Sequence, residues 1–539
     1  MRGRPLPLPM LQYRWMTAFT VLGIAARSVR YLLHFPLWED ESFLCVSVMR
    51  RSYRELMGAL DYHQAAPVPF LWLQKAVTDL VGFNEWSLRL VAYATGIASL
   101  FLFRRVVSRL LDGWSRVAAF GMFAVAYPGI RYAAEAKPYG MDLFVSLVVM
   151  TCVVEWLAAR RQRWLWLLAI AAPTAVAMSL PAAMVVGAAS LVVCHSLWLD
   201  ARPGARRLRA ATSDWAAWAL MNLLALAAGL GVVFLLRDTM TGELAYLRNF
   251  WRADFPPVGE PWRIPIWLLQ HLAGDYLAIP FGGGNYGSTL TLGLAVAGVA
   301  ALWRQRQRTV LFIALAPVAM NLGLAVLQLY PFGGAVKFAL YEMPMVCVVA
   351  GAGIAWALTR PAWTEKRRQQ VTAGVLCGVA AVAIVSMARD AIHPYKTMSD
   401  ARARQWARQF WAATEPPGER VDLKTDLGID FSTPTFQQLS WSATYLVNQR
   451  IYSPRLQRGA GVNWARISRA WPLLVAEYHD AGKPYDPAGR DRWLASLAPR
   501  FALIGTQDVP MDRYDKSERR LLTADFVRVY TFVPRDDGR

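Results

Sequence analysis

Long apolar stretches separated by arginine clusters limit what this 539-residue chain can fold into more than any other feature. A transmembrane helix needs about 17–25 consecutive, mostly apolar residues. The region 164–199 is apolar for long enough to form two short spans, broken near Pro181, and a further stretch covers 288–303. We therefore predict a mainly α-helical, polytopic membrane protein with about eleven transmembrane helices. The other predicted spans lie at 14–33, 88–110, 115–133, 138–159, 215–236, 309–329, 339–358 and 371–388.

The composition indicates that the chain uses lipid as its solvent. Hydrophobic residues make up 55% of the chain and charged residues only 18%, whereas soluble domains average about 45–50% and about 25%. The net charge of +20 raises the alternative of a nucleic-acid-binding protein. The basic residues, however, form short runs between apolar stretches, as in the cytoplasmic loops of membrane proteins, so we expect no nucleic-acid partner. The five cysteines form no CxxC motif and no Cys/His cluster, and we interpret them as buried apolar residues.

The positive-inside rule gives an orientation that is consistent along the whole chain. With the N-terminus in the cytoplasm, every basic cluster between predicted spans lies in a cytoplasmic loop. The opposite side receives the long loops 34–87 and 237–287, the turns 131–137 and 330–338, and everything after 389. The cytoplasmic clusters are Arg104, Arg105 and Arg109; Arg160, Arg161 and Arg163; Arg202, Arg206, Arg207 and Arg209; Arg304, Arg306 and Arg308; and Arg360, Lys366, Arg367 and Arg368.

The C-terminal part differs in character from the rest of the chain. It is charged, poor in long apolar runs and free of cysteine. A helical pattern at 400–414 is followed by strand-like runs at 420–426, 501–505 and 526–533, which alternate with helical segments. We predict two domains: a transmembrane domain over 1–389, whose outer loop 34–87 carries the catalytic motif, and a small extracytoplasmic α/β domain over 390–539.

Two motifs in the first outer loop could carry chemistry. The run Trp38-Glu39-Asp40-Glu41 follows the first span; a solvated acidic loop is the plain alternative, but a base this close to the bilayer can reach a lipid headgroup. The second motif contains His63 and Gln64 ahead of Pro67, which we expect to start a helix that returns the chain to the membrane. A histidine such as His63 is, taken alone, more often structural than catalytic.

Two outer turns add further charges at the same membrane face. Glu135 and Lys137 could form a simple surface pair, yet their turn is too short to leave the level of the lipid phosphates. In the other turn, Gly333-Gly334 precedes Lys337, a pattern that suits close backbone approach to a phosphate. Glu342, one turn into the following span, is costly in lipid, so we expect it to face a cavity. Acids and cations on one outer face indicate a site for a lipid-phosphate substrate.

These motifs resemble the GT-C superfamily of polyprenyl-phosphate-sugar-dependent glycosyltransferases, which includes the protein mannosyltransferase, aminoarabinose transferase and RgtA/B/C/D-like relatives. The resemblance covers most of residues 10–360. It implies that Asp40 is the general base and Glu41 its acidic neighbour, that Glu135 and Lys137 line the same cavity, and that Lys337 contacts the donor phosphate. The motifs that carry it are Trp38-Glu39-Asp40-Glu41, Tyr62-His63-Gln64-Ala65-Ala66-Pro67, Glu135-Ala136-Lys137-Pro138-Tyr139 and Tyr330-Pro331-Phe332-Gly333-Gly334 with Lys337.

The resemblance implies an inverting sugar transfer from a polyprenyl-phosphate donor to a lipid, glycan or protein acceptor, at the outer face of a bacterial cytoplasmic membrane. His63, Gln64, Glu135, Lys137, Tyr139 and Lys337 would then be the substrate-binding residues. Cations would stabilise the charge that grows on the leaving phosphate. The sequence establishes no cofactor; a divalent metal ion could bridge Asp40 or Glu41 to the phosphate, and the sequence neither requires nor excludes it.

Two other classes of protein stay open at this point. A transporter or lipid flippase of cell-envelope biogenesis would show related halves and ionisable residues near the bilayer midplane. We find no paired halves, and the spans 215–236, 309–329 and 371–388 carry no interior charge. A non-catalytic assembly factor would tolerate substitutions in the acidic loop.

Overall fold

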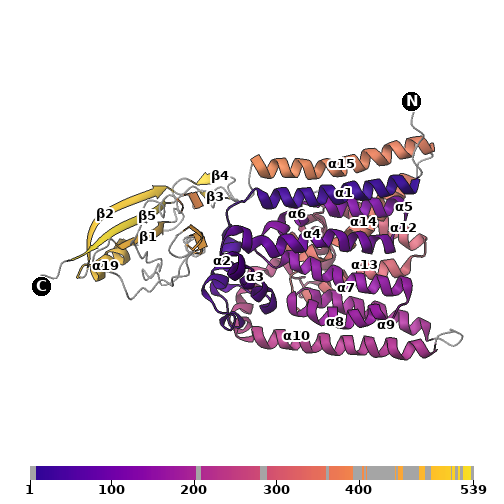
Figure 1. The fold of residues 1–539 in the computed structure, drawn as a ribbon, viewed down its shortest axis with the longest axis horizontal. Coiled ribbons are helices and arrows are strands. Elements are labelled where there is room, and N and C mark those ends of the chain that lie inside the picture. The colour runs from indigo at the N-terminus through magenta and orange to yellow at the C-terminus, as the bar shows by residue number, and fades with distance from the viewer. Residues whose placement is uncertain are drawn as a thin grey trace.

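The computed structural model contains a long helical bundle and a smaller part that contains strands (Figure 1). It describes residues 8–201, 208–279, 288–359 and 363–392 without a break. Of the C-terminal part it describes 404–405, 408, 443–444, 447–448, 450–452, 473–479, 487–499, 501–510, 513–515, 520–522 and 526–535.

Helices cover every predicted span. Seven of the described helices are long and apolar enough to cross a membrane, and α5 with α6 makes an eighth if the bent pair is one span. The protein is therefore a multi-pass membrane protein; the predicted number of eleven spans stays a prediction. The helices over the predicted spans are α1 (Leu8–Leu32), α4 (Glu85–Leu110), α5 (Gly113–Val125), α6 (Tyr127–Arg131), α7 (Tyr139–Ala159), α8 (Arg163–Met178), α9 (Ala182–Asp200), α10 (Leu208–Phe250), α12 (Thr289–Arg304), α13 (Arg308–Val326), α14 (Met343–Thr359) and α15 (Glu365–Ile392).

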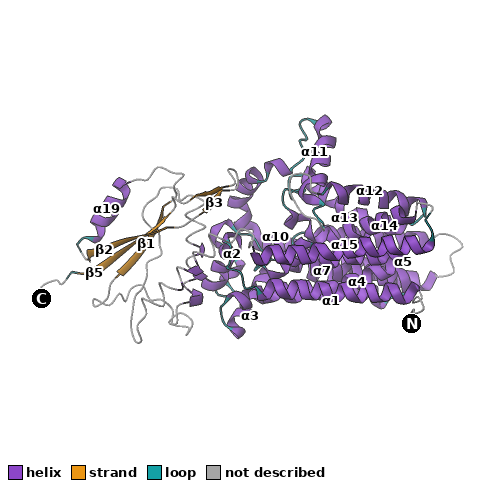
Figure 2. Cartoon of the chain, turned by 90° about the horizontal axis from the view of Figure 1, so that it is seen from above, coloured by secondary structure: helices purple, strands orange, loops and turns teal. Residues whose placement is uncertain are grey.

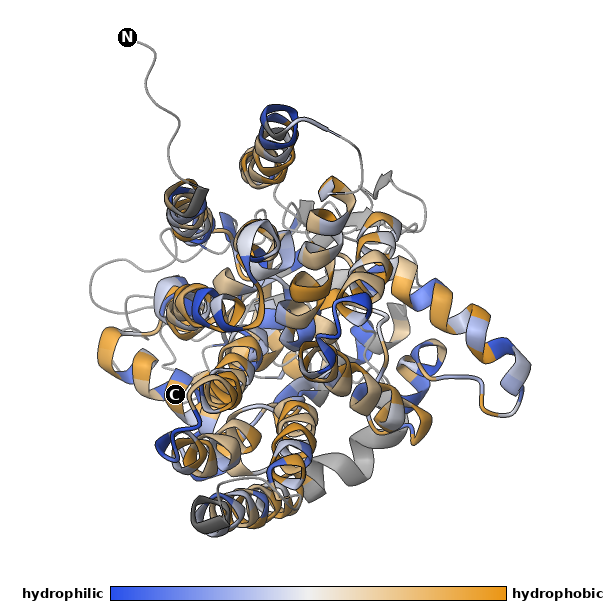
Figure 3. Cartoon of the chain, turned by 90° about the vertical axis from the view of Figure 1, so that its right-hand side faces the viewer, coloured by the Kyte–Doolittle hydropathy of each residue, from blue (hydrophilic) through white to orange (hydrophobic). Residues whose placement is uncertain are grey.

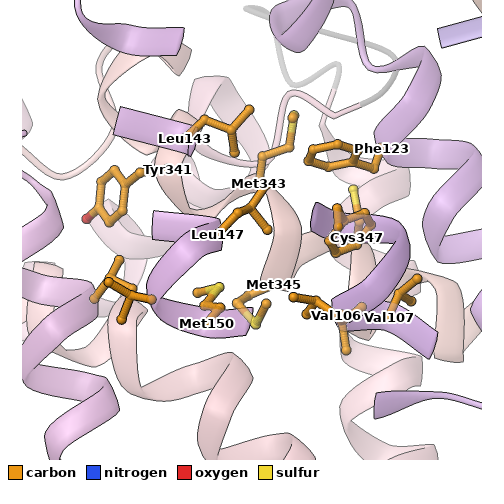
Figure 4. Close-up of a cluster of buried hydrophobic side chains, with 14 of the residues drawn as sticks. Val106, Val107, Phe123, Leu143, Leu147, Met150, Tyr341, Met343, Met345 and Cys347 are labelled. Carbon is orange, nitrogen blue, oxygen red and sulfur yellow. The ribbon is translucent and has the colours of Figure 1, made fainter. Parts of the chain in front are cut away.

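Helices α7 and α14 form the centre of the bundle, and α10 and α15 lie at its periphery. The apolar windows of the two central spans are 78% and 83% buried, against 17% and 22% for the two peripheral ones. A helix that is apolar all round must be covered on every side. Other helices cover it at the centre of the bundle, and lipid covers its outer side at the periphery. Where α12 meets α14, a Cβ on Gly298 would overlap the carbonyl of Val349, so only glycine allows this close approach. Figure 4 shows Met343 and Met345 of α14 between Leu143, Leu147 and Met150 of α7 on one side and Phe123 of α5 on the other.

A bend of 48° separates α5 from the short helical segment that follows it. Pro128 has no backbone N–H, so the carbonyl of Ala124 cannot receive the usual helical hydrogen bond from the residue four positions later. The fully buried Arg27 of α1 supplies the missing donor, because its Nη1 donates to Ala124 O at 2.9 Å and to Gly23 O at 3.0 Å. The bend directs the chain into the turn 131–137, which contains two predicted site residues.

One end of the bundle is covered by short helices, and we call it the α2 end. These are α2 (Glu39–Arg50), the 3-10 turns η1 (Glu55–Met57) and η2 (Asp61–His63), and α3 (Val68–Val81). Helix α3 begins directly after Pro67, as the sequence predicts. Figure 2 shows α2 and α3 at the end of the bundle that faces the strands. The loop 251–279 contains four further short elements: η4 (Arg252–Asp254), η5 (Pro261–Arg263), α11 (Ile264–His271) and η6 (Leu272–Tyr276).

The described C-terminal residues contain a three-stranded antiparallel sheet. Its strand order is β1 (Leu473–His479), β5 (Phe526–Pro534) and β2 (Phe501–Pro510). Helix α19 (Pro487–Leu497) packs Leu494 and Leu497 against Tyr530 and Phe532 of β5. The short strands β3 (Arg513–Asp515) and β4 (Arg520–Leu522) form a separate pair. The predicted runs 501–505 and 526–533 fall within β2 and β5, whereas the run 420–426 and most of the helical pattern 400–414 lie outside the described residues.

Candidate active site

Two of the three acids in the first turn of helix α2, Asp40 and Glu41, have different surroundings. The carboxylate of Glu41 is fully buried and receives two hydrogen bonds from Arg89 of α4, at 2.8 and 2.6 Å. It also accepts the backbone N–H of Ala136 at 2.7 Å. Glu41 therefore fastens α2 to both α4 and the turn 131–137. Arg89 completes this junction by donating to the carbonyls of Phe35 and Pro36.

Asp40 lies between two lysines that come from distant parts of the chain. Lys137 Nζ is 2.9 Å from Asp40 Oδ1, and Lys337 Nζ is 3.2 Å from Oδ2. The Asp40 side chain is 19% exposed, so this cluster lies at the edge of the protein interior. Burial by itself would raise the pKa of Asp40, but the two ammonium groups more than offset it and hold the pKa of that carboxyl well below its usual range.

The turn 131–137 supplies Lys137 and keeps it in place. Gln64 accepts a hydrogen bond from Lys137 Nζ at 2.6 Å and donates to the carbonyl of Tyr62 at 3.1 Å. Glu135, which is 3% exposed, accepts from Arg131 Nε at 2.6 Å through Oε1. Its other oxygen, Oε2, has no hydrogen-bond partner among the described residues. The alternative that Glu135 and Lys137 form a simple surface pair is therefore wrong, because both side chains are buried.

The turn before Lys337 depends on its two glycines. Gly333 and Gly334 have φ values of +85° and +72°, a region that other residues rarely adopt. The close backbone approach expected at this Gly-Gly pair is made to protein, since a Cβ on Gly334 would overlap the carboxylate of Asp254. Phe332 N also donates to Asp254 O at 2.9 Å. At this turn, Lys337 alone stays a predicted phosphate contact. Its Nζ lies 5.5–6.0 Å from the centres of the rings of Tyr139, Trp251 and Phe338.

The structure brings most of the predicted site residues together at the α2 end. Asp40, Lys137, Lys337, Gln64 and Tyr139 form one continuous group, and Glu41 lies behind it in its pair with Arg89. His63 belongs to η2, but its side chain lies outside the described residues. Glu342, expected at a cavity, is fully buried and accepts a hydrogen bond from the Tyr276 hydroxyl.

Sequence reasoning missed several residues that build this group: Arg89, Arg131, Trp251 and Asp254. A signal existed for Arg89, because an arginine inside an apolar stretch is costly unless it is paired. In the described part of the chain, no three His, Cys, Asp or Glu side chains come together as a metal site. The oxygens of Asp40 and Glu41, the two residues predicted to meet a metal if one binds, are already paired with Lys137, Lys337 and Arg89.

Comparison with known proteins adds evidence of kinship. A family model described as dolichyl-phosphate-mannose-protein mannosyltransferase matches residues 65–228, which include the turn 131–137. No curated protein matches the chain in sequence. Residues 65–228 thus lie within the region in which the motifs resemble GT-C enzymes.

Several solved structures are similar to the chain. Apo ArnT from Cupriavidus metallidurans has a TM-score of 0.49 and 15% identity, with 95% of this chain and 98% of ArnT covered. The same protein bound to undecaprenyl phosphate gives 0.46 and 14%, with 96% and 98% covered. Oligosaccharyltransferase AglB from Archaeoglobus fulgidus, in complex with an inhibitory peptide and a dolichol-phosphate, gives 0.43 and 10%, with 82% of this chain covered. This chain spans 65% of the length of that protein.

The matched region contains the motif Glu135–Tyr139 and the end of the motif Tyr62–Pro67, whereas the motifs at 38–41 and 330–337 lie outside it. The match confirms the resemblance to the GT-C glycosyltransferases over residues 65–228.

Proposed function

We propose that the protein transfers a sugar from a polyprenyl-phosphate donor to a hydroxyl group of a lipid, glycan or protein acceptor, with inversion at the anomeric carbon. The observation that carries this proposal is the pairing of Asp40 with Lys137 and Lys337 at one end of a membrane bundle. A carboxylate held between two cations provides, in one place, a proton acceptor and the counter-charges for a phosphate.

The two lysines would move from Asp40 to the phosphate when the donor binds. The donor phosphate is an anion and competes with Asp40 for the same two ammonium groups. Once their charge is shared with the phosphate, the pKa of Asp40 rises from its depressed value towards its usual range. The resting carboxylate is therefore a weak base, and donor binding converts it into a stronger one.

The reaction then follows from this arrangement. The acceptor oxygen attacks the anomeric carbon and forms the new glycosidic bond, while the bond from that carbon to the phosphate oxygen breaks. The bonding pair leaves with the polyprenyl phosphate, where Lys137 and Lys337 stabilise the added charge. Asp40 accepts the proton of the acceptor hydroxyl. The buried Glu135 Oε2, which has no partner among the described residues, would accept a hydrogen bond from a sugar hydroxyl.

The site would work at the extracytoplasmic face of a bacterial cytoplasmic membrane, and residues 390–539 would lie on that same side. The arginine clusters in the opposite loops support this orientation. Residues 1–389 would form the transferase domain and residues 390–539 an α/β domain, for which the sheet formed by β1, β5 and β2 is the supporting observation.

The test is a transfer assay in membranes that contain the wild type, Asp40→Asn or Asp61→Asn. A panel of radiolabelled polyprenyl-phosphate sugars serves as donors. Asp61 is the matched control, because it is a carboxylate of the same loop that is bound to Arg51 rather than to the two lysines. We expect label transfer by the wild type and Asp61→Asn and none by Asp40→Asn at equal protein level. Equal transfer by all three proteins would rule out Asp40 as the base.

A further inference from the structure

Helix α11 is apolar on two opposite faces, although it belongs to a loop between spans. On one face, Trp267 is 8% exposed and packs with Phe332 of the Lys337 turn, at 5.8 Å between ring centres. On the other face, Ile266 is 54% and Leu269 51% exposed, and Trp262 of the preceding turn η5 is 74% exposed. Steps of four and three residues place these three side chains on one side of the helix. A helix that is apolar all round is stable only when both faces are removed from water.

The position of α11 indicates what covers its exposed face. Figure 2 shows α11 projecting sideways from the bundle, within the length of the bundle rather than beyond its α2 end. The spans of the bundle are mostly hydrophobic along their length (Figure 3). They expose apolar side chains, such as Leu226 of α10 at 62% and Leu290 of α12 at 59%. The turn η6 connects α11 to this belt by its contacts with α12. Helix α11 therefore lies beside a span whose exposed side chains are apolar.

The residues that flank the apolar face have the composition of a membrane interface. Arg263 is exposed and pairs with Glu260 at 2.9 Å, next to Trp262. Tryptophan and arginine beside an apolar helical face are typical of segments that lie in the plane of the headgroups, with the apolar side among the acyl chains. The geometry points to α11 as an in-plane membrane helix: its Ile266 and Leu269, together with Trp262 of η5, contact the lipid of the leaflet at the α2 end.

The same helix supports the turn that carries Lys337. Trp267 Nε1 donates to the carbonyl of Ala253 at 3.0 Å, and His271 Nε2 lies 3.4 Å from Asp254 Oδ1. The ring of His271 also borders Gly333, and Asp254 closes over Gly334. Lipid contact on one face of α11 would thus hold the helix in place, while the other face packs against the Gly333–Gly334 turn. This inference does not depend on the reaction that the protein catalyses.

The test measures contact with lipid at single positions of the purified full-length protein. The background protein is Cys194→Ala/Cys377→Ala, because these two native cysteines are not fully buried. Ile266→Cys and Leu269→Cys are labelled with an environment-sensitive fluorophore and reconstituted into phosphatidylethanolamine and phosphatidylglycerol nanodiscs, with or without brominated acyl chains. Leu226→Cys, in the middle of α10, is the control for lipid contact, and Arg54→Cys, exposed in the loop 51–60, is the control for water.

We expect brominated lipid to quench the fluorophore at positions 266 and 269 as much as at position 226, and to leave position 54 unchanged. Quenching at 266 and 269 no greater than at position 54 would overturn the inference. The nanodiscs contain no other protein. If this face binds a partner protein instead of lipid, quenching at positions 266 and 269 will be no greater than at position 54. Two positions are tested so that one poorly folded variant does not decide the outcome; each must elute as a single species from the reconstituted sample.

Discussion

Asp40 and Glu41 are neighbours in sequence, yet the helix gives them opposite surroundings. Successive side chains of an α-helix point about 100° apart, at 3.6 residues per turn. Glu41 consequently points inwards to Arg89, and Asp40 points to the two lysines and to the edge of the protein. The acidic run is visible in the sequence. Which of its acids pairs with which cation is not, because Arg89, Lys137 and Lys337 come from other segments. Glu41 connects helix α2, which carries Asp40, to α4 and to the turn 131–137.

Removing the charge of Glu41 should destabilise the protein. Glu41→Gln leaves the Arg89 guanidinium buried without its counter-charge, and breaking a buried pair in this way costs about 3–5 kcal/mol. We expect a clear drop in the thermal unfolding temperature of the purified protein in detergent. Glu55→Gln, which changes an exposed carboxylate of the same loop, should leave it unchanged. Equal unfolding temperatures for Glu41→Gln and Glu55→Gln would contradict the role given to Glu41.

Because its pKa is depressed, Asp40 should contribute equally to the stability of the protein at mildly acidic and neutral pH. A carboxyl whose pKa is lowered by folding adds stability above its unfolded pKa of about 3.9 and loses it as the pH falls through the folded value. Because the folded pKa lies still lower, the pairs with Lys137 and Lys337 stay intact from pH 5 to pH 8. The difference in unfolding temperature between the wild type and Asp40→Asn should therefore be the same at pH 5 and pH 8. A difference that vanishes at pH 5 would show that Asp40 takes up a proton in this range.

At the scale of single elements, the bend between α5 and α6 brings the turn 131–137 to the site. Pro128 removes one backbone donor and Arg27 replaces it. Proline at a helix break is visible in a sequence. The partner of the freed carbonyl is not, because Arg27 lies 97 residues from Ala124 along the chain.

The pairing of Arg27 with the bend can be tested by a double-mutant cycle. Arg27→Met leaves Ala124 O unpaired, at a cost of about 1–3 kcal/mol. Pro128→Ala supplies a backbone N–H that can take over this hydrogen bond. We expect Arg27→Met to lower the unfolding temperature less in the Pro128→Ala background than in the wild type. Additive effects of the two substitutions would contradict a shared role at Ala124.

The spans were predictable from the sequence, whereas the short elements between them were not. Apolar length is enough to find a transmembrane helix, and α4, α7 and α13 begin and end within a few residues of the predicted ranges. Helix α11 has only eight residues and lies in the predicted loop 237–287, so a search for long apolar stretches misses it. The sequence predicts a close approach of the Gly-Gly turn to a phosphate, whereas the structure shows that Asp254, about 80 residues away in sequence, lies against Gly334.

At the scale of the whole molecule, the described C-terminal residues reach back to the α2 end. Ala443, Val447 and Ile451 are buried in one apolar cluster with Phe43 and Val46 of α2. Tyr452 donates a hydrogen bond to Glu85 Oε1 at 2.5 Å, and Arg404 donates to the carbonyl of His34 at 2.8 Å. The sequence separates the chain into two parts of different composition, but it contains no sign that the second part covers the helix that carries Asp40.

This contact predicts that the C-terminal part supports the site. Val447→Asp places an unpaired charge against α2, where burial of a charge without a partner is strongly unfavourable. We expect reduced sugar transfer and a lower unfolding temperature. Ile504→Asp, at a side chain that is 60% exposed on β2, should change neither. Normal activity and stability of Val447→Asp would show that the C-terminal residues do not support α2.

The central claim is that Asp40 and the donor phosphate share Lys137 and Lys337. The most direct measurement is the binding affinity of polyprenyl phosphate for the wild type and for Asp40→Asn, made on the same preparations that are assayed for transfer. Without the competing carboxylate both lysines are free for the phosphate, so we predict tighter binding by Asp40→Asn together with a loss of transfer of about 100-fold or more. Unchanged or weaker binding, or transfer at the wild-type rate, would contradict the account.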